Sequence, residues 1–410
     1  MPTAAPESKL PIVTVRARDA RRLVAGHPWV FDGAIESAPP DLVDGAIVAV
    51  EDPARRLLGI GPWNGRSRIR VRLLARQPVP IDADFFERRI RAALAVRERH
   101  LPAATSYRLV NSESDGLPGL VVDRYEDVLV LQIASLGLDR MKAAIVDALV
   151  RVCAPRAILE RSDAASRRFE GLEPASGLLA GELEQARALP IRLNGLRFEV
   201  DLEAGHKTGL YLDQQLNYEA VARFARGGRV LDCFSFLGGF GLHAARAGAA
   251  HVRMLDQSAD AVAASLRNAA ANGLEARCEA EVANVFDWLK ARSRAEVRER
   301  EAPFDLIVLD PPSFTRSRSS VPDALRGYKE IHLRALRLLA PGGVLATFCC
   351  SHHVDAAAFL SAIQAAAFDA RVVLRRVACY AQSPDHPVIP SIPETEYLKG
   401  FAFEKVDEAV

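Results

Sequence analysis

The sequence has few cysteines, no long apolar run and almost no net charge. Its six cysteines, in 410 residues, follow neither the spacing of a metal site nor that of a disulfide framework. No stretch reaches the ~18 consecutive apolar residues that cross a membrane, and nothing at the N-terminus looks like a secretory signal. We therefore expect a protein of the reducing cytoplasm, without a structural metal or a membrane segment.

Charge is balanced over the whole chain but not along it. The formal net charge is +1, yet residues 1–110 hold 18 Lys and Arg against 12 Asp and Glu, and residues 111–410 hold 35 against 40. A basic N-terminal part indicates contact with an anion, most commonly nucleic acid. A plain solvated surface is the alternative. The length, with 49% apolar residues, predicts two or three domains, each with its own core.

The stretch from Arg229 to Asp256 has the pattern of one half of a nucleotide-binding α/β unit. A short apolar strand ends at Asp232, a glycine cluster and helix formers follow, and a second apolar strand ends at Asp256. The glycines, which let a backbone approach a ligand closely, are Gly238, Gly239 and Gly241. An acidic residue at the end of the second strand can accept hydrogen bonds from both hydroxyls of a ribose.

Three interpretations of this turn compete. Residues 239–244, Gly-Phe-Gly-Leu-His-Ala, fit the G-x-G-x-x-A dinucleotide template, which predicts an NAD(P) oxidoreductase. Against it, Asp232 brings a carboxylate near the glycines, where it would repel a pyrophosphate. The same carboxylate suits a positively charged ligand, such as the ammonium and sulfonium groups of S-adenosylmethionine. A tight turn without any ligand is the third interpretation.

The N-terminal part predicts a short tail and a β domain. Residues 1–10 are rich in Pro and Ala and are expected to be disordered. Residues 11–78 alternate apolar runs with Gly and Pro, which predicts a small β-barrel. Because strand side chains alternate between two faces, Arg66, Arg68, Arg70 and Arg72 should share one face. We expect this stripe outside the barrel, in contact with phosphates; ordinary strand amphipathicity seldom selects four arginines without a carboxylate.

The remaining chain predicts a central α+β domain over residues 79–190 and an α/β domain over residues 191–410. In the α/β domain, strands alternate with helices and two closing strands follow near 372–380 and 397–403. The five alternating strands end near Asp232, Asp256, Asn284, Asp310 and Cys350. This order, closed by a hairpin, is the methyltransferase variant of the doubly wound sheet. A dinucleotide fold does not end that way.

Sheets of this type bind ligands at the carboxyl ends of their strands, where these five polar residues stand. Asp232 and the glycines would hold the amino-acid part of S-adenosylmethionine. Asp256 would hold its ribose, and Asn284 would contact the edge of its adenine. A cap or a turn is the alternative role for each residue.

Asp310 and Cys350 suggest the reaction. Asp310 opens an Asp-Pro-Pro motif, which fixes its carboxylate on a stiff, extended turn. Amino-group methyltransferases have an aromatic residue directly after a similar motif, whereas Ser313 stands here, which argues against N6-adenine methylation. A thiolate that adds to C6 of a pyrimidine makes C5 able to accept a methyl group. We expect Cys350 to be this nucleophile, Asp310 to face cytosine, and Cys349 to be structural; buried packing is the alternative for Cys350.

With further motifs, the chain resembles a known family, the RlmI-type large-subunit ribosomal RNA cytosine-C5 methyltransferases, over nearly its whole length. The motifs are Gly-His-Pro-Trp-Val-Phe at 26–31, Ser-Arg-Ile-Arg-Val-Arg at 67–72, Lys-Thr-Gly at 207–209, Leu-Asp-Gln at 212–214, Asp-Cys-Phe-Ser at 232–235, Asp-Pro-Pro-Ser-Phe at 310–314, Cys-Ser at 350–351, Asp-His-Pro at 385–387 and Tyr-Leu-Lys-Gly at 397–400.

The resemblance implies an N-terminal PUA domain that binds RNA, a central α+β domain and a C-terminal Rossmann-like class I methyltransferase domain. It implies S-adenosyl-L-methionine as cofactor, large-subunit ribosomal RNA as partner, Cys350 as nucleophile and Asp310 at the target base. The expected cofactor-binding residues are Tyr211, Asp213, Gln214, Asp232, Phe234, Ser235, Gly238, Gly239, Gly241, Asp256, Gln257 and Asn284. The expected RNA-binding residues are Arg66, Arg68, Arg70, Arg72 and Lys207.

The chain also departs from this family. Gln215 stands where the family usually has arginine, and Asn284 where it often has aspartate; both bear on cofactor affinity. Relatives in the wider group modify other positions, so C5 methylation of a uridine or of transfer RNA stays open. A non-catalytic RNA-binding protein with the same fold is a further alternative, against which Asp310 and Cys350 speak. The modified nucleotide and the oligomeric state, with a homodimer as one candidate, do not follow from the sequence.

Overall fold

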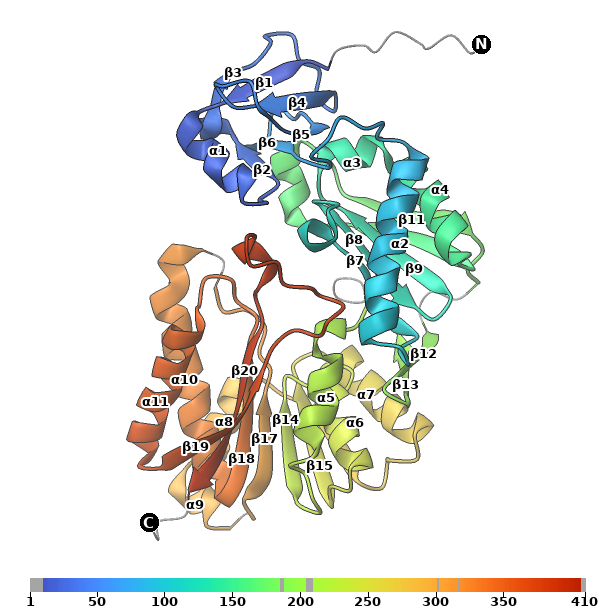
Figure 1. The fold of residues 1–410 in the computed structure, drawn as a ribbon. Helices are drawn as coiled ribbons and strands as arrows, with labels where there is room; N and C mark the ends of the chain where they lie inside the picture. Colours follow the sequence, from blue (N-terminus) through green and yellow to red (C-terminus); the bar gives the residue numbers. More distant parts are fainter. Residues whose placement is uncertain (1–9, 185–187, 204–208, 301, 316, 407–410) are drawn as a thin grey trace. The chain divides into compact units, whose positions relative to one another are not determined.

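The computed structural model describes residues 10–184, 188–203, 209–300, 302–315 and 317–406 (Figure 1). They form two compact units. Unit 1 comprises Met1–Ala186, Leu202–Gly209 and Pro384–Thr395, and unit 2 comprises Arg187–Asp201, Leu210–Ser383 and Glu396–Val410. Two segments within the range predicted for the methyltransferase domain therefore group with unit 1. The second of them is tied in by Asp385, which accepts a hydrogen bond from the Arg108 amide (2.9 Å) and, at its carbonyl, from Arg97 (2.7 Å).

The N-terminal part of unit 1 is a small β structure around one core. Its elements are β1 (Ile12–Val15), α1 (Ala17–Val24), β2 (Trp29–Phe31), β3 (Ile35–Ser37), β4 (Ile47–Glu51), β5 (Leu57–Pro62) and β6 (Ile69–Arg72). One sheet has the order β3-β1-β4-β5, and β2 pairs with β6. Alternate residues such as Val13, Val15, Val48 and Val50 are fully buried, as expected of strands with one face on a core.

The central part of unit 1 is a five-stranded sheet with helices packed on it. Its elements are α2 (Ala83–His100), β7 (Ser106–Asn111), β8 (Leu120–Tyr125), β9 (Val128–Ile133), α3 (Leu136–Arg140), α4 (Lys142–Cys153), β10 (Ala157–Ser162) and β11 (Ala175–Gly181). The sheet order is β11-β10-β9-β8-β7. The Asp82 side chain accepts a hydrogen bond from the Phe85 amide and caps the start of α2.

Unit 2 is a seven-stranded sheet with helices and a separate hairpin. The hairpin is β12 (Leu189–Leu193) and β13 (Leu196–Val200), and the other elements are α5 (Gln215–Ala222), β14 (Arg229–Cys233), α6 (Gly239–Arg246), β15 (His251–Asp256), α7 (Ala259–Ala271), β16 (Cys278–Val282), α8 (Val285–Arg292), α9 (Ala295–Arg298), β17 (Phe304–Leu309), α10 (Val321–Leu338), β18 (Leu339–Cys349), α11 (Ala356–Ala370), β19 (Val373–Tyr380) and β20 (Lys399–Val406). In the hairpin turn, Asn194 and Gly195 both have positive φ, at 50° and 81°.

The strand order β16-β15-β14-β17-β18-β20-β19 gives the sheet its ligand-binding edge. The strands β14 to β18 are parallel to one another, and β20 is antiparallel to both β18 and β19. The chain moves outward from β14 to β16 and then returns to the other side of β14 with β17. The carboxyl ends of β14 and β17 therefore flank the point where the order reverses, at which open α/β sheets bind ligands. This is the class I methyltransferase fold that the sequence predicts.

Candidate active site

The turn between β14 and α6 is shaped by residues with unusual backbone angles. Phe234 and Phe236 have positive φ (63° and 48°), as does Gly238 (86°). The amide of Gly241 donates to Asp232 Oδ2 at 2.8 Å. A Cβ atom on Gly241 would lie 2.8 Å from Met254 Cγ and 3.1 Å from Asp232 Oδ2, so only glycine fits there. The glycine cluster thus allows helix α6 to begin directly against the Asp232 carboxylate.

Asp232 is buried, and one of its two carboxylate oxygens lacks a hydrogen-bond donor within the described residues. Its Oδ1 atom and the neighbouring Ser235 Oγ have no hydrogen-bond partner within the described part of the chain. Burial and the Asp256 carboxylate raise the pKa of Asp232 to about 7, against the opposing effect of the Gly241 amide. A buried carboxylate oxygen that lacks a donor fits a ligand that brings a positive charge and N–H groups. The ammonium end of S-adenosylmethionine has both.

Asp256 stands at the end of β15, the strand next to β14. Its Oδ2 accepts a hydrogen bond from the Phe236 amide, and its Oδ1 accepts one from the Ser258 amide, both at 2.9 Å. Because each carboxylate oxygen has two lone pairs, Asp256 can still accept from hydroxyl groups. The next residue, Gln257, is exposed. The predicted ribose contact of Asp256 stays a prediction.

Asn284 has a structural role at the end of β16. Its Oδ1 caps helix α8 by accepting from the amides of Phe286 (3.0 Å) and Asp287 (3.3 Å). The side chain is exposed. Its oxygen is therefore occupied by the helix, and only its amide nitrogen is left for the predicted contact with adenine.

Tyr211, Asp213 and Gln214 precede α5, and their side chains meet other parts of unit 2. The hydroxyl of Tyr397 donates to Asp213 Oδ2 at 2.6 Å. Gln214, which the sequence assigned to the cofactor, donates its amide N–H to Asp310 Oδ1 at 3.1 Å. Burial raises the pKa of Tyr211, and the nearby Asp310 and Cys350 raise it further. Gln214 therefore contacts the Asp310 carboxyl, and Tyr211 lies near it.

Asp310 and Cys350 follow the ends of neighbouring parallel strands, as predicted. Asp310 comes directly after β17, and Cys350 directly after β18. The Cys350 thiol lies 3.9 Å from the carbonyl oxygen of Pro311, the residue after Asp310. Cys350 is partly exposed, whereas Cys349 is fully buried in the core. The two adjacent cysteines therefore have the different environments that strand alternation predicts.

Three residues that support this site were not assigned a role from the sequence. Asn217 donates to Gln214 Oε1 (2.6 Å), Tyr397 holds Asp213, and Lys399 donates to the carbonyls of Ser351 (2.6 Å) and Val354 (2.8 Å) in the turn after Cys350. Asn217 could have been found, because residues three apart share one face of a helix. Tyr397 and Lys399 belong to a quoted motif, but no local pattern connects them to residues far away in the sequence.

The predicted arginine stripe is only partly correct. The strand β6 contains Ile69–Arg72, so Arg66 and Arg68 lie in the preceding loop. Arg72 is only 13% exposed and pairs with Glu170 at 2.8 Å, so its place on an exposed stripe is wrong. Arg66 is 71% exposed and lies 3.5 Å from Asp44. The pairing carboxylates come from distant segments. Lys207 lies outside the described residues.

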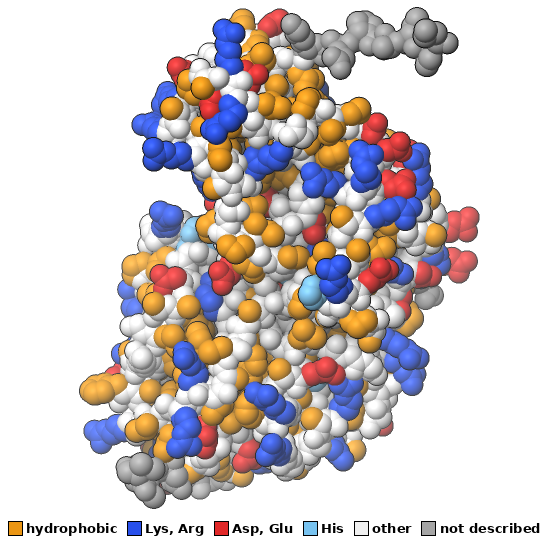
Figure 2. All heavy atoms as spheres, in the orientation of Figure 1, with side chains coloured by type: hydrophobic (Ala, Val, Ile, Leu, Met, Phe, Trp, Pro, Cys, Tyr) orange, Lys and Arg blue, Asp and Glu red, His pale blue; other side chains and the backbone are white. Residues whose placement is uncertain are grey.

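Further exposed arginines, which the sequence pattern did not single out, lie on and beside helix α1. They are Arg16, Arg18, Arg21 and Arg22. Figure 2 shows Lys and Arg side chains gathered over this helix on the face in view. The guanidinium of Arg22 also lies 5.3 Å from the centre of the Phe31 ring. The basic side chains of the N-terminal part therefore lie on and beside helix α1 as well as on β6 and the loop before it.

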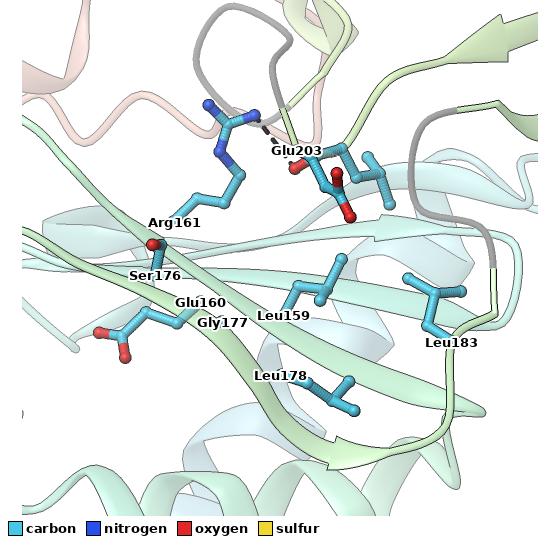
Figure 3. A pocket seen from close by; sticks show the side chains of 9 residues that line it. Leu159, Glu160, Arg161, Ser176, Gly177, Leu178, Leu183 and Glu203 are labelled. Carbon is cyan, nitrogen blue, oxygen red and sulfur yellow. Dashed lines mark hydrogen bonds between the residues drawn. The ribbon is translucent and has the colours of Figure 1, made fainter.

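Unit 1 has a cavity of about 340 Å³ beside β10 and β11 (Figure 3). The leucines Leu159, Leu178 and Leu183 line it, and Arg161 lies at one side. Arg161 donates to the Leu202 carbonyl at 3.1 Å, the dashed line in Figure 3. None of the predicted site residues lines this cavity, so it carries none of the chemistry above.

Known proteins resemble both parts of the chain. A family model of S-adenosylmethionine-dependent methyltransferases matches residues 147–393, and a model of a PUA-like domain matches residues 13–76. Ribosomal RNA large subunit methyltransferase I of Shewanella denitrificans is 43% identical over 387 residues, which cover 93% of this chain and 96% of that protein. The protein of the same name from Photobacterium profundum is 40% identical, with 95% and 98% covered.

Solved structures agree on the fold. A SAM-dependent methyltransferase from Streptococcus mutans has a TM-score of 0.80 and 23% identity, with 96% of this chain and 99% of that chain covered. The methyltransferase SMU.776, solved in complex with SAH, has a TM-score of 0.81 with the same identity and coverage. At this identity the likeness shows the fold alone. The enzyme class follows instead from the family model over residues 147–393 and from the relatives that are at least 40% identical over nearly the whole chain: this chain is an S-adenosylmethionine-dependent methyltransferase and belongs to the family of ribosomal RNA large subunit methyltransferase I.

Proposed function

We propose that the enzyme methylates C5 of a cytidine in large-subunit ribosomal RNA through a covalent adduct between Cys350 and C6 of the base. One observation carries this proposal. A partly exposed thiol, Cys350, follows the strand next to the one that leads into Asp310, and its sulfur lies 3.9 Å from the Pro311 carbonyl. A nucleophile and a carboxyl at adjacent strand ends are what C5 chemistry on a pyrimidine needs.

In this proposal, Cys350 is the nucleophile and Asp310 contacts the target base. The target cytidine must leave any stack to reach the strand ends. The Cys350 thiolate forms a bond to C6, and Asp310 shares a proton with N3, which offsets the charge that builds on the ring. S-adenosylmethionine supplies the methyl group that C5 accepts. A base then removes the C5 proton, the electron pair restores the C5–C6 double bond, and the sulfur–C6 bond breaks.

The test is to map 5-methylcytidine by bisulfite sequencing in ribosomal RNA from cells with and without the gene. One cytidine of the large-subunit RNA should be protected from conversion only when the gene is present. Purified enzyme with S-adenosylmethionine should restore the mark on RNA from the deleted strain. A methyl group found instead on a uridine, or on transfer RNA, would contradict this proposal and support the alternative, C5 methylation of another RNA pyrimidine.

The first prediction concerns the ribose of the cofactor. Asp256→Ala should weaken the binding of S-adenosylmethionine at least tenfold, because a hydrogen bond to a carboxylate contributes about 1.5–3 kcal/mol. Calorimetric titration measures the affinity. Asp260→Ala, which removes an exposed carboxylate from the first turn of α7, is the matched control and should bind normally. Wild-type affinity in the Asp256→Ala protein would contradict the ribose assignment.

The second prediction concerns pH. Because the pKa of Asp232 is raised to about 7 by burial, this carboxyl is mostly protonated below pH 7 and cannot pair with a cation. The dissociation constant of S-adenosylmethionine should therefore rise as the pH falls below 7, by up to about tenfold per pH unit, and level off above it. Asp232→Asn should bind weakly and without this slope. A wild-type affinity that is constant between pH 5.5 and 7 would argue against contact between Asp232 and the cofactor.

A further inference from the structure

A short helical turn in unit 1 presents an aromatic side chain to solvent. This turn, η3 (Ala165–Glu170), has the sequence Ala-Ser-Arg-Arg-Phe-Glu. Phe169 is 77% exposed, and Arg168 beside it is exposed as well. The residues on either side of this pair, Arg167 and Glu170, are buried. The turn therefore buries two charged side chains, Arg167 and Glu170, and exposes its only large apolar side chain. This is the reverse of the usual preference for buried apolar and exposed charged residues.

Hydrogen bonds hold both buried charged side chains of this turn in place. Arg167 donates to the carbonyls of Ile133 (2.5 Å) and Glu173 (2.8 Å) and to Asp139 (3.2 Å). Charged hydrogen bonds of this kind fix the backbone of a turn. Phe169 thus projects from a rigid support, which lowers the entropy lost when a ligand binds it.

Glu170 joins the turn to the arginine-rich loop before β6. Its carboxylate accepts from Asn64 (2.9 Å) and Ser67 (2.5 Å) and pairs with Arg72 (2.8 Å). The aliphatic part of Arg66 lies on Gly171, where an added Cβ would be only 2.9 Å from Arg66 Cδ. Two segments about 100 residues apart in the sequence therefore form one continuous surface.

This surface combines one aromatic ring with an excess of positive charge. We define the Phe169 surface as Phe169, Arg168, Arg66 and Arg68, all of which are exposed. The carboxylates beside it are Glu170, which Arg72 neutralises, and Asp44, which lies 3.5 Å from Arg66. A single exposed phenylalanine is ordinary on a protein surface. An exposed ring on a fixed turn beside three arginines is the arrangement that binds unpaired nucleotides.

We propose that the Phe169 surface binds a single-stranded segment of the RNA substrate, with one unpaired base stacked on Phe169 and the neighbouring phosphates held by Arg66, Arg68 and Arg168. This inference rests on the proposed function, since it takes ribosomal RNA as the substrate. It adds a binding site formed jointly by the central part of unit 1 and the loop before β6. It also gives the exposed arginines of the predicted stripe, Arg66 and Arg68, a partner of opposite charge.

The test compares three substitutions of Phe169 in the full-length enzyme, with fluorescently labelled fragments of large-subunit ribosomal RNA that contain single-stranded segments. Phe169→Ala and Phe169→Leu should weaken RNA binding about tenfold, because leucine keeps the apolar area but loses the ring face. Phe169→Trp should bind at least as tightly as the wild type, and its added fluorescence should be quenched by RNA. The affinity for S-adenosylmethionine and the melting temperature should not change.

Two controls separate stacking from other effects. Phe368→Ala removes a ring of 83% exposure from the end of α11 in unit 2 and should leave RNA binding unchanged. Arg168→Ala should reduce the dependence of log K on log salt concentration by roughly 0.7, the value for one phosphate contact of a single strand. Phe169→Ala should leave that slope as it is. Equal losses in the Phe169→Leu and Phe169→Trp proteins would exclude stacking.

The outcomes distinguish this inference from the proposed function. If the wild type methylates a cytidine and Phe169→Ala binds RNA within twofold of it, the surface is not an RNA site and the proposed function stands. If Phe169→Ala weakens RNA binding but no cytidine is methylated, the surface stands and the proposed function fails. A loss seen only with a ribosomal particle, and not with naked RNA, would assign the surface to a protein and overturn this inference.

Discussion

Cys350→Ala is expected to bind S-adenosylmethionine and RNA like the wild type and to transfer no measurable methyl group. Turnover should fall on the order of 10⁴-fold or more, the scale of loss when a covalent nucleophile is removed. Binding should survive because Cys350 is a small side chain at the end of β18, and the cofactor is expected at β14 and β15. Single-turnover assays with radiolabelled cofactor measure the first effect, and calorimetry the second.

Two other cysteines serve as controls. Cys349→Ala removes a fully buried sulfur from the core, so it should lower stability by about 1 kcal/mol and keep most of the activity. Cys379→Ala alters an exposed thiol on β19 and should change neither property. RNA with 5-fluorocytidine at the target should trap the wild type as an adduct, because C5 then has no proton to lose. A trapped peptide that contains Cys349 or Cys379, or an active Cys350→Ala enzyme, would overturn the assignment.

The strand ends could be predicted because local signals mark them. Asp232, Asp256, Asp310 and Cys350 each follow an apolar run, and two prolines directly follow Asp310. A parallel sheet then brings the ends together without further information. The positions of the chemically important residues in the fold were thus within reach of sequence reasoning, although the contacts they make were not.

Contacts between distant segments could not be predicted from local patterns. The sequence places Arg72 on an exposed stripe, but its side chain is mostly buried and pairs with Glu170, which lies far along the chain. Gln214 was assigned to the cofactor, but its amide reaches Asp310, which is 96 residues away.

The hydrogen bonds near Asp310 fix which way the side-chain amides of Asn217 and Gln214 are turned. The carbonyl of Ala381 can only accept, so the Asn217 amide nitrogen faces it (2.9 Å) and also donates to Gln214 Oε1 (2.6 Å). The Gln214 nitrogen must then face Asp310 Oδ1, at 3.1 Å. Gln214 therefore holds Oδ1 of Asp310. In the proposed mechanism, we expect the target base to meet the carboxyl at Oδ2.

Substitutions of Asp310 should separate cytidine from uridine as the substrate. Asp310→Ala should reduce turnover roughly 10²–10⁴-fold, the range for a lost proton-transfer group. In Asp310→Asn, the donor from Gln214 should turn the new amide oxygen toward Gln214 and the new amide nitrogen toward the base. That nitrogen can donate to N3 of cytosine, which accepts, but it opposes the N3–H of uracil. Asp310→Asn should therefore be about tenfold more active on cytidine than Asp310→Ala.

Gln214→Leu tests the reasoning behind this expectation. Without the Gln214 donor the amide at position 310 is free to turn either way, so the advantage of Asp310→Asn over Asp310→Ala should shrink in the Gln214→Leu background. The comparison is a double-mutant cycle on the single-turnover rate, in which a coupling clearly different from zero is expected because the two side chains are in contact. Equal rates for Asp310→Asn and Asp310→Ala with intact Gln214 would mean that N3 is not the atom that Asp310 meets. The covalent role of Cys350 would then have to be supported by another proton donor.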